Sequence, residues 1–130
     1  MEPGMAAVSS GSSLSLPRAR RIKQGRDFAR ARTQGKRVAS GCLIANWVVL
    51  TPGSATRVGV ITGRKIGAAV ARGRARRLLR EAFRVNQVRL NRTVDLVLVA
   101  RASIVGKSFA EVEGDFLAAL RKAGLLKEGI

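Results

Sequence analysis

The segment from Gly63 to Arg84 constrains this chain most, because its sequence, GRKIGAAVARGRARRLLREAFR, combines helix-forming residues with eight basic residues and one acid. On a helix with 3.6 residues per turn, its apolar side chains fall on one face. That face consists of Ala71, Ala75, Leu78 and Ala82, with Leu79 and Val85 beside it. The pattern predicts a helix from about Ala68 to Val88 that buries this face.

The charged face of the predicted helix indicates an anionic partner. It carries arginines at a spacing of four residues: Arg72, Arg76, Arg80 and Arg84, with Arg77 beside them and Arg74 on the other shoulder of the apolar face. Like charges at this spacing repel each other by about 0.2–0.5 kcal/mol per pair, and only Glu81 offsets them locally. A solvated face usually alternates acidic and basic residues. The repulsion therefore favours a surface that binds a polyanion over an ordinary solvated face.

The distribution of charge along the chain points to nucleic acid. The net charge is +17, and 19 of the 25 basic residues are arginine. Residues 18–37 contain nine basic residues and one acid, and residues 57–92 contain eleven and one, whereas residues 93–130 contain five of each. Two basic segments predict a lopsided positive surface. Because the planar fork of arginine binds phosphate and stacks on bases, we expect a nucleic acid as the partner.

Membrane binding and export are not expected. The predicted helix opposes its arginines with alanines, whereas insertion into a bilayer needs Trp, Phe and Leu. The chain has no apolar run of about 20 residues, the length of a spanning helix, and residues 1–17 do not resemble a secretion signal. With one cysteine, Cys42, we expect a cytoplasmic protein without internal disulfides that buries this residue in its core.

Composition divides the chain into a domain and two tails. Residues 1–15 are rich in Ser, Gly and Ala, which predicts a disordered tail. Residues 16–125 predict a single RNA-binding domain, since a chain of 130 residues is large enough for one modest core. Residues 126–130 predict a short C-terminal tail. Within the domain, the first element is a predicted helix at 25–34, anchored by Ile22, Phe28 and Ala31.

The rest of the pattern predicts strands and a last helix. Residues 38–50 are apolar and β-branched, and a TPGS turn separates them from a strand at 57–62, so we expect an antiparallel hairpin. Residues 94–100, VDLVLVA, predict a strand covered on both faces. Residues 108–123 predict a helix that begins with a capping box of Ser108 and Glu111 and packs on the sheet. The expected fold class is α+β, a small two-layer sandwich with the order α-β-β-(β)-α-β-α.

The chain lacks the usual side chains of protein-based catalysis. It has no histidine, no tyrosine and one cysteine, which removes the usual general base, zinc ligands and Cys/His pair. Glu111 and Asp115 fit a solvated helix face better than a magnesium site. Asp95 is expected to form hydrogen bonds near a strand end, with a hydrated ion as the alternative. We therefore predict no catalytic residue and no dedicated metal site in the protein.

The run from Arg57 to Arg84 resembles the signature region of the bacterial ribonuclease P protein subunit, in which a strand and a basic turn lead into a helix of the type R-N-R-x-K-R-x-x-R-E. The residues that match this pattern are Arg72, Arg74, Arg76, Arg77, Arg80 and Glu81, with Arg76 in place of lysine. The run from Leu16 to Val38 is also similar to the opening of the family, including Phe28 and Gly35. The resemblance covers about residues 16–120.

The resemblance implies a division of labour between RNA and protein. A large catalytic RNA hydrolyses the phosphodiester bond with Mg²⁺, which the RNA and the substrate bind, and the protein supports removal of the 5′ leader from precursor tRNA. The basic helix is expected to contact the catalytic RNA through Arg72, Gly73, Arg74, Arg76, Arg77 and Arg80. A cleft between the first helix and the open sheet face is expected to bind the leader through Phe28, Arg32, Lys36, Asn46, Arg64 and Lys65. The family also implies a left-handed β-α-β crossover, an exception to the right-handed rule.

Three positions depart from the family pattern. Gly73 replaces the usual asparagine, which costs a helix about 0.5–1 kcal/mol relative to alanine and suggests that the helix begins later or bends there. Arg32 and Asn46 stand where aromatic residues are common, so we expect the leader cleft to depend on charge and guanidinium stacking. Phe28 is left open between base stacking and core packing, and Trp47 is expected in the core.

Two other functions are compatible with the sequence. A general RNA-binding or ribosome-associated structural protein would also combine a small sandwich with a basic helix. A protein-only nuclease is a third hypothesis, which the missing histidines and the dispersed acids disfavour. Residues 18–23 are left undecided between RNA contact and simple charge.

Overall fold

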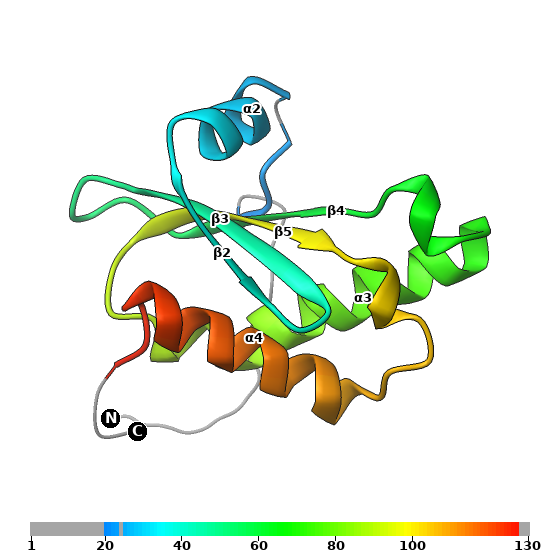
Figure 1. The fold of residues 1–130 in the computed structure, drawn as a ribbon. Helices are drawn as coiled ribbons and strands as arrows, with labels where there is room; N and C mark the ends of the chain where they lie inside the picture. The colour runs from blue at the N-terminus through cyan, green and yellow to red at the C-terminus, as the bar shows by residue number, and fades with distance from the viewer. Residues whose placement is uncertain (1–19, 24, 128–130) are drawn as a thin grey trace.

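The computed structural model describes residues 20–23 and 25–127, and Figure 1 shows its elements. The helices and strands are α2 (Gly25–Thr33), β2 (Lys36–Ser40), β3 (Leu43–Val49), β4 (Arg57–Ile61), α3 (Ala69–Asn86), β5 (Val94–Ala100) and α4 (Phe109–Ala123). Short 3-10 helices follow β4, α3 and β5: η2 (Arg64–Ile66), η3 (Gln87–Arg89) and η4 (Ala102–Ile104). The predicted disordered tail at 1–15 and the last three residues of the predicted C-terminal tail lie outside the described residues.

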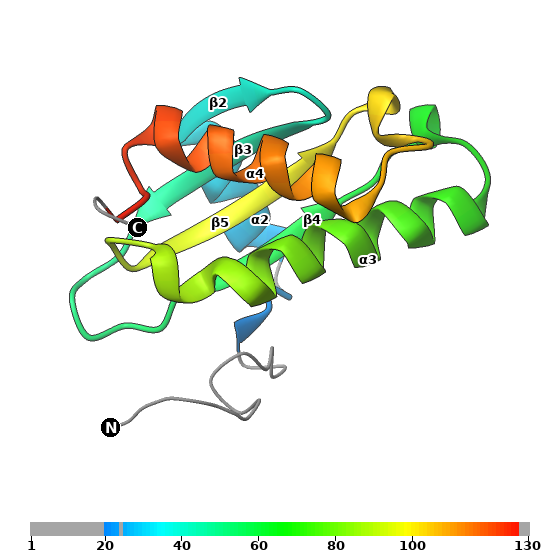
Figure 2. The same ribbon diagram turned by 90° about the horizontal axis from the view of Figure 1, so that it is seen from below.

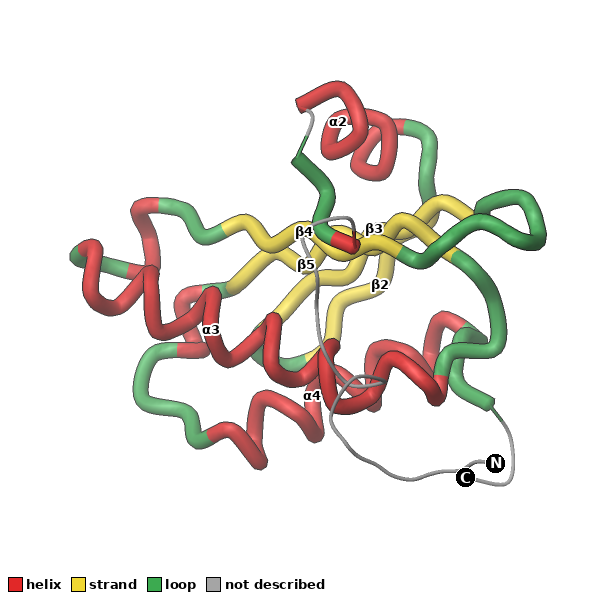
Figure 3. The backbone as a smooth tube through the Cα atoms, turned by 180° about the vertical axis from the view of Figure 1, so that it is seen from behind, coloured by secondary structure: helices red, strands yellow, loops and turns green. Residues whose placement is uncertain are grey.

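The strands form a four-stranded sheet in the order β2-β3-β5-β4. Strands β2 and β5 both pair antiparallel with β3, whereas β4 pairs parallel with β5. Helices α3 and α4 cover one face of this sheet (Figure 2), and α2 lies on the other face, as the view from behind also shows (Figure 3). The predicted α+β class is confirmed, and the strand that the prediction left optional is present.

The predicted hairpin between residues 38–50 and 57–62 is wrong. Residues 38–50 form parts of two strands, because the chain turns at Gly41 and Cys42 and β2 pairs with β3. Strand β5 then lies between β3 and β4. Nearly all its side chains are apolar and buried, and a central place in the sheet covers both of its faces. The parallel β4–α3–β5 connection is present, and its handedness stays a prediction.

The main core lies between the sheet and the helices α3 and α4. Leu79 and Phe83 of α3 and Phe116 of α4 are almost fully buried in it. The predicted buried face of α3 is confirmed at Ala75 and Ala82, but its centre is shifted towards Leu79 and Phe83, because Ala71 and Leu78 are only partly buried. Since α4 packs beside α3, Leu78 faces the seam between the two helices while Leu79 faces the sheet.

Several smaller predictions about the core and the last helix are confirmed. Trp47 and Cys42 are buried in the main core. The Ser108 Oγ accepts a hydrogen bond from the Glu111 N–H at 3.2 Å, and the Ser108 N–H donates to Glu111 Oε1 at 2.9 Å, which completes the capping box. Asp115 Oδ2 accepts a hydrogen bond of 3.0 Å from the Cys42 N–H. Both acids of α4 that were considered for a metal therefore have structural roles.

Helix α2 packs on the opposite sheet face over a smaller apolar cluster. Ile22, Ala31 and Val97 are buried there, and Phe28 packs against them. The Phe28 ring lies so close to Gly59 of β4 that a Cβ at this position would overlap it. A glycine is needed where a ring approaches the backbone this closely. Phe28 is thus a packing residue of α2, and its role in base stacking stays a prediction.

An ion-pair network attaches α2 to the sheet. Asp95 of β5 is 1% exposed and accepts hydrogen bonds from Arg57 Nε at 2.9 Å and from Arg57 Nη2 at 2.6 Å. It also accepts a bond of 3.1 Å from Arg30 of α2. Arg57 lies 3.5 Å from a carboxylate oxygen of Asp27, at the start of α2. The predicted hydrogen-bonding role of Asp95 is confirmed, and the network joins α2, β4 and β5.

Candidate RNA-binding surfaces

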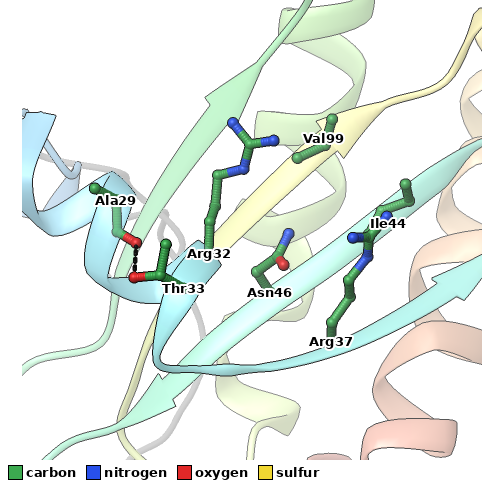
Figure 4. Close-up of a pocket in the computed structure, with 7 residues that line it drawn as sticks. All are labelled: Ala29, Arg32, Thr33, Arg37, Ile44, Asn46 and Val99. Carbon is green, nitrogen blue, oxygen red and sulfur yellow. Dashed lines mark hydrogen bonds between the residues drawn. The ribbon is translucent and has the colours of Figure 1, made fainter.

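Part of the sheet face that carries α2 is open. A hollow beside α2 is lined by Ala29, Arg32, Thr33, Arg37, Ile44, Asn46 and Val99 (Figure 4). A second hollow, next to η2, is lined by Ile44, Ile61, Gly63, Arg64, Lys65, Ile66, Val99, Ala100, Arg101 and Ala102. Because the two hollows share Ile44 and Val99 as lining residues, they adjoin each other over β3 and β5. We call these two adjoining hollows together the sheet channel.

The sheet channel combines positive rims with a largely apolar floor. Its lining includes no acid and five cationic side chains, all exposed: Arg32, Arg37, Arg64, Lys65 and Arg101. The floor between them consists of the partly buried side chains of Ile44, Ile61 and Val99, with Asn46 beside them. Cations that follow a phosphate backbone beside a surface for the bases are features of single-strand nucleic acid binding.

Asn46 is the polar side chain of the channel floor. The residue is 4% exposed, and its amide points into the hollow between Arg32 and Arg37 (Figure 4). It makes no hydrogen bond with the other residues that line this hollow. An amide side chain carries an acceptor oxygen and a donor NH₂ group. The amide is therefore suited to a ligand that supplies a donor and an acceptor together.

The structure places four of the six residues predicted for leader binding in the sheet channel. These are Arg32, Asn46, Arg64 and Lys65. Phe28 lines neither hollow, because it packs under α2. Lys36 is opposite Trp47 in the β2–β3 register and shares its face, which is the face of the main core. The neighbouring residue Arg37 is opposite Asn46 and lines the channel in place of Lys36.

Sequence reasoning missed Arg37 and Arg101. Side chains alternate along a strand, so Asn46 would have identified Arg37 as its partner once the β2–β3 register was known. The register depends on the turn at Gly41, and the prediction of one strand over residues 38–50 did not include this turn. Arg101 follows β5 directly, and it reaches the channel only because β5 is central in the sheet.

The arginines of α3 form a second cationic surface, on the helix side of the sheet. Arg74 and Arg77 are exposed, and Arg72, Gly73, Arg76 and Arg80 are partly buried; we call these six residues the α3 surface. Three of the guanidinium groups donate hydrogen bonds to neighbouring segments: Arg72 to the Gly67 carbonyl at 2.6 Å, Arg74 to the Lys107 carbonyl at 2.8 Å and Arg76 to Thr62 Oγ1 at 2.8 Å. These bonds orient the charges before any partner binds.

The charge of the α3 surface is crowded on its flank towards β4. Burial, and after it the positive charges of Arg21 and Arg76, lower the pKa of Arg80. A nearby anion would favour the charged form of such a group. The sequence pattern predicted that Arg76 and Arg80 lie opposite the buried face of the helix. They lie on the flank towards β4 instead, because the buried face is shifted towards Leu79 and Phe83. Helix α3 begins at Ala69, as the predicted start at about Ala68 requires, so the alternative of a later start caused by Gly73 does not occur.

The described residues contain neither a metal-binding cluster nor a membrane-spanning helix. No three side chains of His, Cys, Asp or Glu lie together in a way that could hold a metal ion. The six acids of this part of the chain have protein partners: Asp27 and Asp95 pair with arginines, Glu81 with Arg84, Glu111 with Ser108, Glu113 with Asn86 and Asp115 with the Cys42 N–H. No helix between residues 25 and 127 is long and apolar enough to cross a membrane.

The fold and the two surfaces define a class of small basic α+β proteins in which a four-stranded sheet separates two cationic surfaces. The family model described as Ribonuclease P matches residues 16–124, and the chain belongs to this family. Members of the family are the protein subunits of ribonuclease P, a ribonucleoprotein endoribonuclease that acts on precursor tRNA. The resemblance read from the sequence is thereby confirmed.

Similar proteins cover nearly the whole described domain. The ribonuclease P protein component of Gluconacetobacter diazotrophicus is 39% identical over 110 residues, which cover 83% of this chain and 94% of that protein. That of Syntrophomonas wolfei is 39% identical over 110 residues, covering 85% and 92%. The solved structure of the RNase P protein of Staphylococcus aureus matches with a TM-score of 0.76 at 24% identity, over 85% of this chain and all of that one. This last likeness shows the fold.

Proposed function

We propose that this chain binds the catalytic RNA of ribonuclease P through the α3 surface and the 5′ leader of precursor tRNA in the sheet channel. The observation that supports this assignment is the separation of the two cationic surfaces by the sheet. Helices α2 and α3 lie on opposite faces of the sheet (Figure 1), and the hollow beside α2 belongs to the sheet channel. One protein can therefore contact two RNA strands at once. This bridging would promote magnesium-dependent maturation of the 5′ end of tRNA.

The channel suits an unpaired leader better than a duplex. It is a depression over two strands, floored by side chains such as Ile44 and Val99, on which unpaired bases can stack. The exposed guanidinium groups of Arg32 and Arg37 can contact phosphates or stack on bases. Asn46 then offers its unpartnered amide to the edge of one base. Stacking by Arg32 takes the place of the aromatic floor that the family pattern implies.

The α3 surface suits the backbone of a structured RNA. Its arginines come from one rigid helix and are oriented by hydrogen bonds to Gly67, Lys107 and Thr62. Guanidinium groups held in place bind phosphate oxygens with little loss of side-chain entropy. Burial, and after it the charges of Arg21 and Arg76, lower the pKa of Arg80, and a bound phosphate would favour its charged form.

Magnesium is assigned to the RNA and the substrate in this proposal. When bound there, it would activate the attacking water and stabilise the leaving oxygen. The six acids among the described residues are already engaged, as with Asp95, whose oxygens accept bonds from Arg30 and Arg57. The protein would act by neutralising phosphates and positioning the leader. A role in tRNA processing also implies a cytoplasmic location.

A reconstitution experiment tests the proposed function. Precursor tRNA is incubated in low magnesium with the protein alone, with the cognate catalytic RNA alone, and with both. We expect cleavage at the mature 5′ end to be much faster with both than with the RNA alone, and absent with the protein alone. Cleavage by the protein alone would establish a protein-only nuclease. An RNA activity that the protein never increases would favour a general RNA-binding protein.

A second experiment separates the two surfaces. Replacing Arg72, Arg74 and Arg76 with alanine should weaken assembly with the catalytic RNA and reduce the salt dependence of binding, by roughly 0.7–0.9 in slope for each lost phosphate contact. Replacing Arg32 with alanine should leave assembly unchanged and reduce the preference for substrates with a leader over those without one. If both variants changed both measurements equally, the two-surface assignment would be wrong.

A further inference from the structure

A third hollow lies on the seam between α3 and α4, on the face of the molecule away from the sheet channel. It has a volume of about 490 Å³ and is lined by Arg74, Arg77, Leu78, Glu81 and Phe109. Leu78 and Phe109 are partly buried and pack against the main core. We call this feature the seam hollow. It adjoins the α3 surface, because Arg74 and Arg77 belong to both.

The walls of the seam hollow are held in place by interactions of the protein itself. Phe109 is the first residue of α4, and the capping box of Ser108 and Glu111 sets where that helix begins. Arg74 of α3 donates a hydrogen bond of 2.8 Å to the carbonyl of Lys107, just before α4. This bond ties the two sides of the seam together. The hollow is therefore preformed and needs little ordering when a ligand enters.

The seam hollow presents an apolar floor inside a positive rim. Its acid, Glu81, accepts hydrogen bonds from Arg84 Nε at 2.9 Å and from Arg84 Nη2 at 2.5 Å. These bonds lower the pKa of Glu81, so the carboxylate is ionised and its charge is balanced by a neighbour. The charges of Arg74 and Arg77 remain to face a ligand. A flat apolar group that carries a phosphate complements this arrangement.

We propose that the seam hollow binds one unpaired nucleobase of the catalytic RNA, which stacks on Phe109 and Leu78 while Arg77 contacts an adjacent phosphate. The inference depends on the proposed function, which places this RNA along α3. Unpaired bases that stack on aromatic side chains, with arginine on the backbone, are the usual means by which proteins recognise structured RNA. The precursor leader is not the expected ligand, because the seam hollow lies between α3 and α4, which cover the sheet face opposite α2 (Figure 2), whereas the proposed leader site lies beside α2.

The test compares variants that keep or remove the aromatic ring. Phe109→Leu retains an apolar side chain without a ring, and Phe109→Tyr retains the ring. Binding to the in vitro transcribed catalytic RNA is measured over a range of salt concentrations, and unpaired bases are mapped by chemical probing. We expect Phe109→Leu to bind about tenfold more weakly, within the range for loss of one base stack, with an unchanged salt slope. One unpaired nucleotide protected by the wild type should become reactive.

Matched controls make the result specific. Phe109→Tyr should keep both the affinity and the protection. Val88→Ala removes apolar surface from an exposed valine (54% exposed) just beyond the end of α3 and should change neither. Thermal unfolding checks that each variant is folded, and if Phe109→Leu were not, Leu78→Ala would replace it, with the same expected loss of affinity and of protection.

The outcomes distinguish this inference from the proposed function. If Phe109→Leu bound like the wild type with the same protected bases while Arg77→Ala bound more weakly, the nucleobase site would be wrong and the assignment of α3 to RNA would stand. If neither variant weakened binding, the nucleobase site and the assignment of α3 to the catalytic RNA would both be wrong. Protection that appears only when precursor tRNA is added would assign the base to the substrate and overturn the inference.

Discussion

Asp95 of β5 accepts two hydrogen bonds from the guanidinium of Arg57 on the neighbouring strand β4, at 2.9 and 2.6 Å. The same carboxylate binds Arg30 of α2 at 3.1 Å, so one buried acid connects the sheet to the helix above it. Because α2 forms one wall of the sheet channel, this ion pair also determines where Arg32 stands over the channel floor. A structural ion pair and a binding surface are thus coupled.

Asp95→Asn should reduce the free energy of unfolding by about 2–4 kcal/mol, since removing one partner of a buried ion pair leaves the other unpaired. We do not expect a larger loss of stability, because the Arg57 side chain is 30% exposed and water can solvate its charge in the variant. Chemical denaturation measures it. Glu81→Gln is the matched control, because the side chains of the Glu81–Arg84 pair are 46% and 33% exposed, against 1% for Asp95, and this pair should contribute at most about 1 kcal/mol. Equal losses in the two variants would contradict the role given to Asp95.

Arg37→Ala should weaken binding of the assembled particle to precursor tRNA, while Lys36→Ala should not. The two variants remove the same charge from adjacent exposed residues, but only Arg37 lines the sheet channel. The measurement is the affinity for substrates with and without a leader, and the salt slope should fall by roughly 0.7 for one lost contact to a single strand. A loss in both variants would mean that net charge, and not the channel, attracts the leader.

Gly73→Ala should stabilise the protein by about 0.5–1 kcal/mol, because alanine is the better helix former. Helix α3 continues through this position, and an added Cβ would meet only Arg77 and Arg76, at 3.5 and 3.9 Å. Thermal and chemical unfolding provide the measurement. The control is Gly67→Ala, which should destabilise, since Gly67 has a φ of +122° that other residues rarely adopt.

Cys42 should be unreactive in the folded protein and should make stability fall at high pH. Burial, followed by the hydrogen bond and the charge of Asp115, raises the pKa of its thiol from 9.0 to about 12. Below about pH 9 the thiol is protonated in both the folded and the unfolded state. Between about pH 9 and pH 12 it ionises only in the unfolded chain, which stabilises that chain, so the free energy of unfolding decreases as the pH rises.

Two measurements check the prediction for Cys42. A thiol reagent at pH 8 should modify the protein only after denaturant is added, because the thiolate is the reactive form. The free energy of unfolding should decrease less between pH 9 and pH 11 in Cys42→Ala than in the wild type. Rapid modification of the native protein, or parallel pH curves for the two proteins, would contradict the assigned burial and pKa.

The helices were predictable because their signals are local. Ser108 and Glu111 lie within one turn and determine the start of α4, and the spacing of Phe116 and Leu120 determines its buried face. The buried strand β5 was predictable from its apolar run alone. The shift in the buried face of α3 arises because the helix has two neighbours: Leu78 packs at the seam with α4, whereas Leu79 packs against the sheet.

The strand pairing and part of the channel were not predictable, because they depend on distant segments. Nothing near Arg57 shows that its strand pairs with residues 38 positions later, at Asp95. Whether Lys36 or Arg37 lines the channel depends on the register between β2 and β3. A change of one residue in this register would move every side chain of the strand to the other face of the sheet. Arg32, Asn46, Arg64 and Lys65 could be grouped only through the family resemblance, which supplied the missing arrangement in space.

The central place of β5 has a consequence for how the protein is made. Strands β3 and β4 are adjacent in the sequence but do not pair with each other, since β5 lies between them and pairs with both. During synthesis, the β2–β3 hairpin can form early, whereas β4 and α3 must wait for residues 94–100 to leave the ribosome. Until β5 is in place, α3 cannot bury Leu79 and Phe83 against the complete sheet, so a strongly basic helix would expose its apolar face.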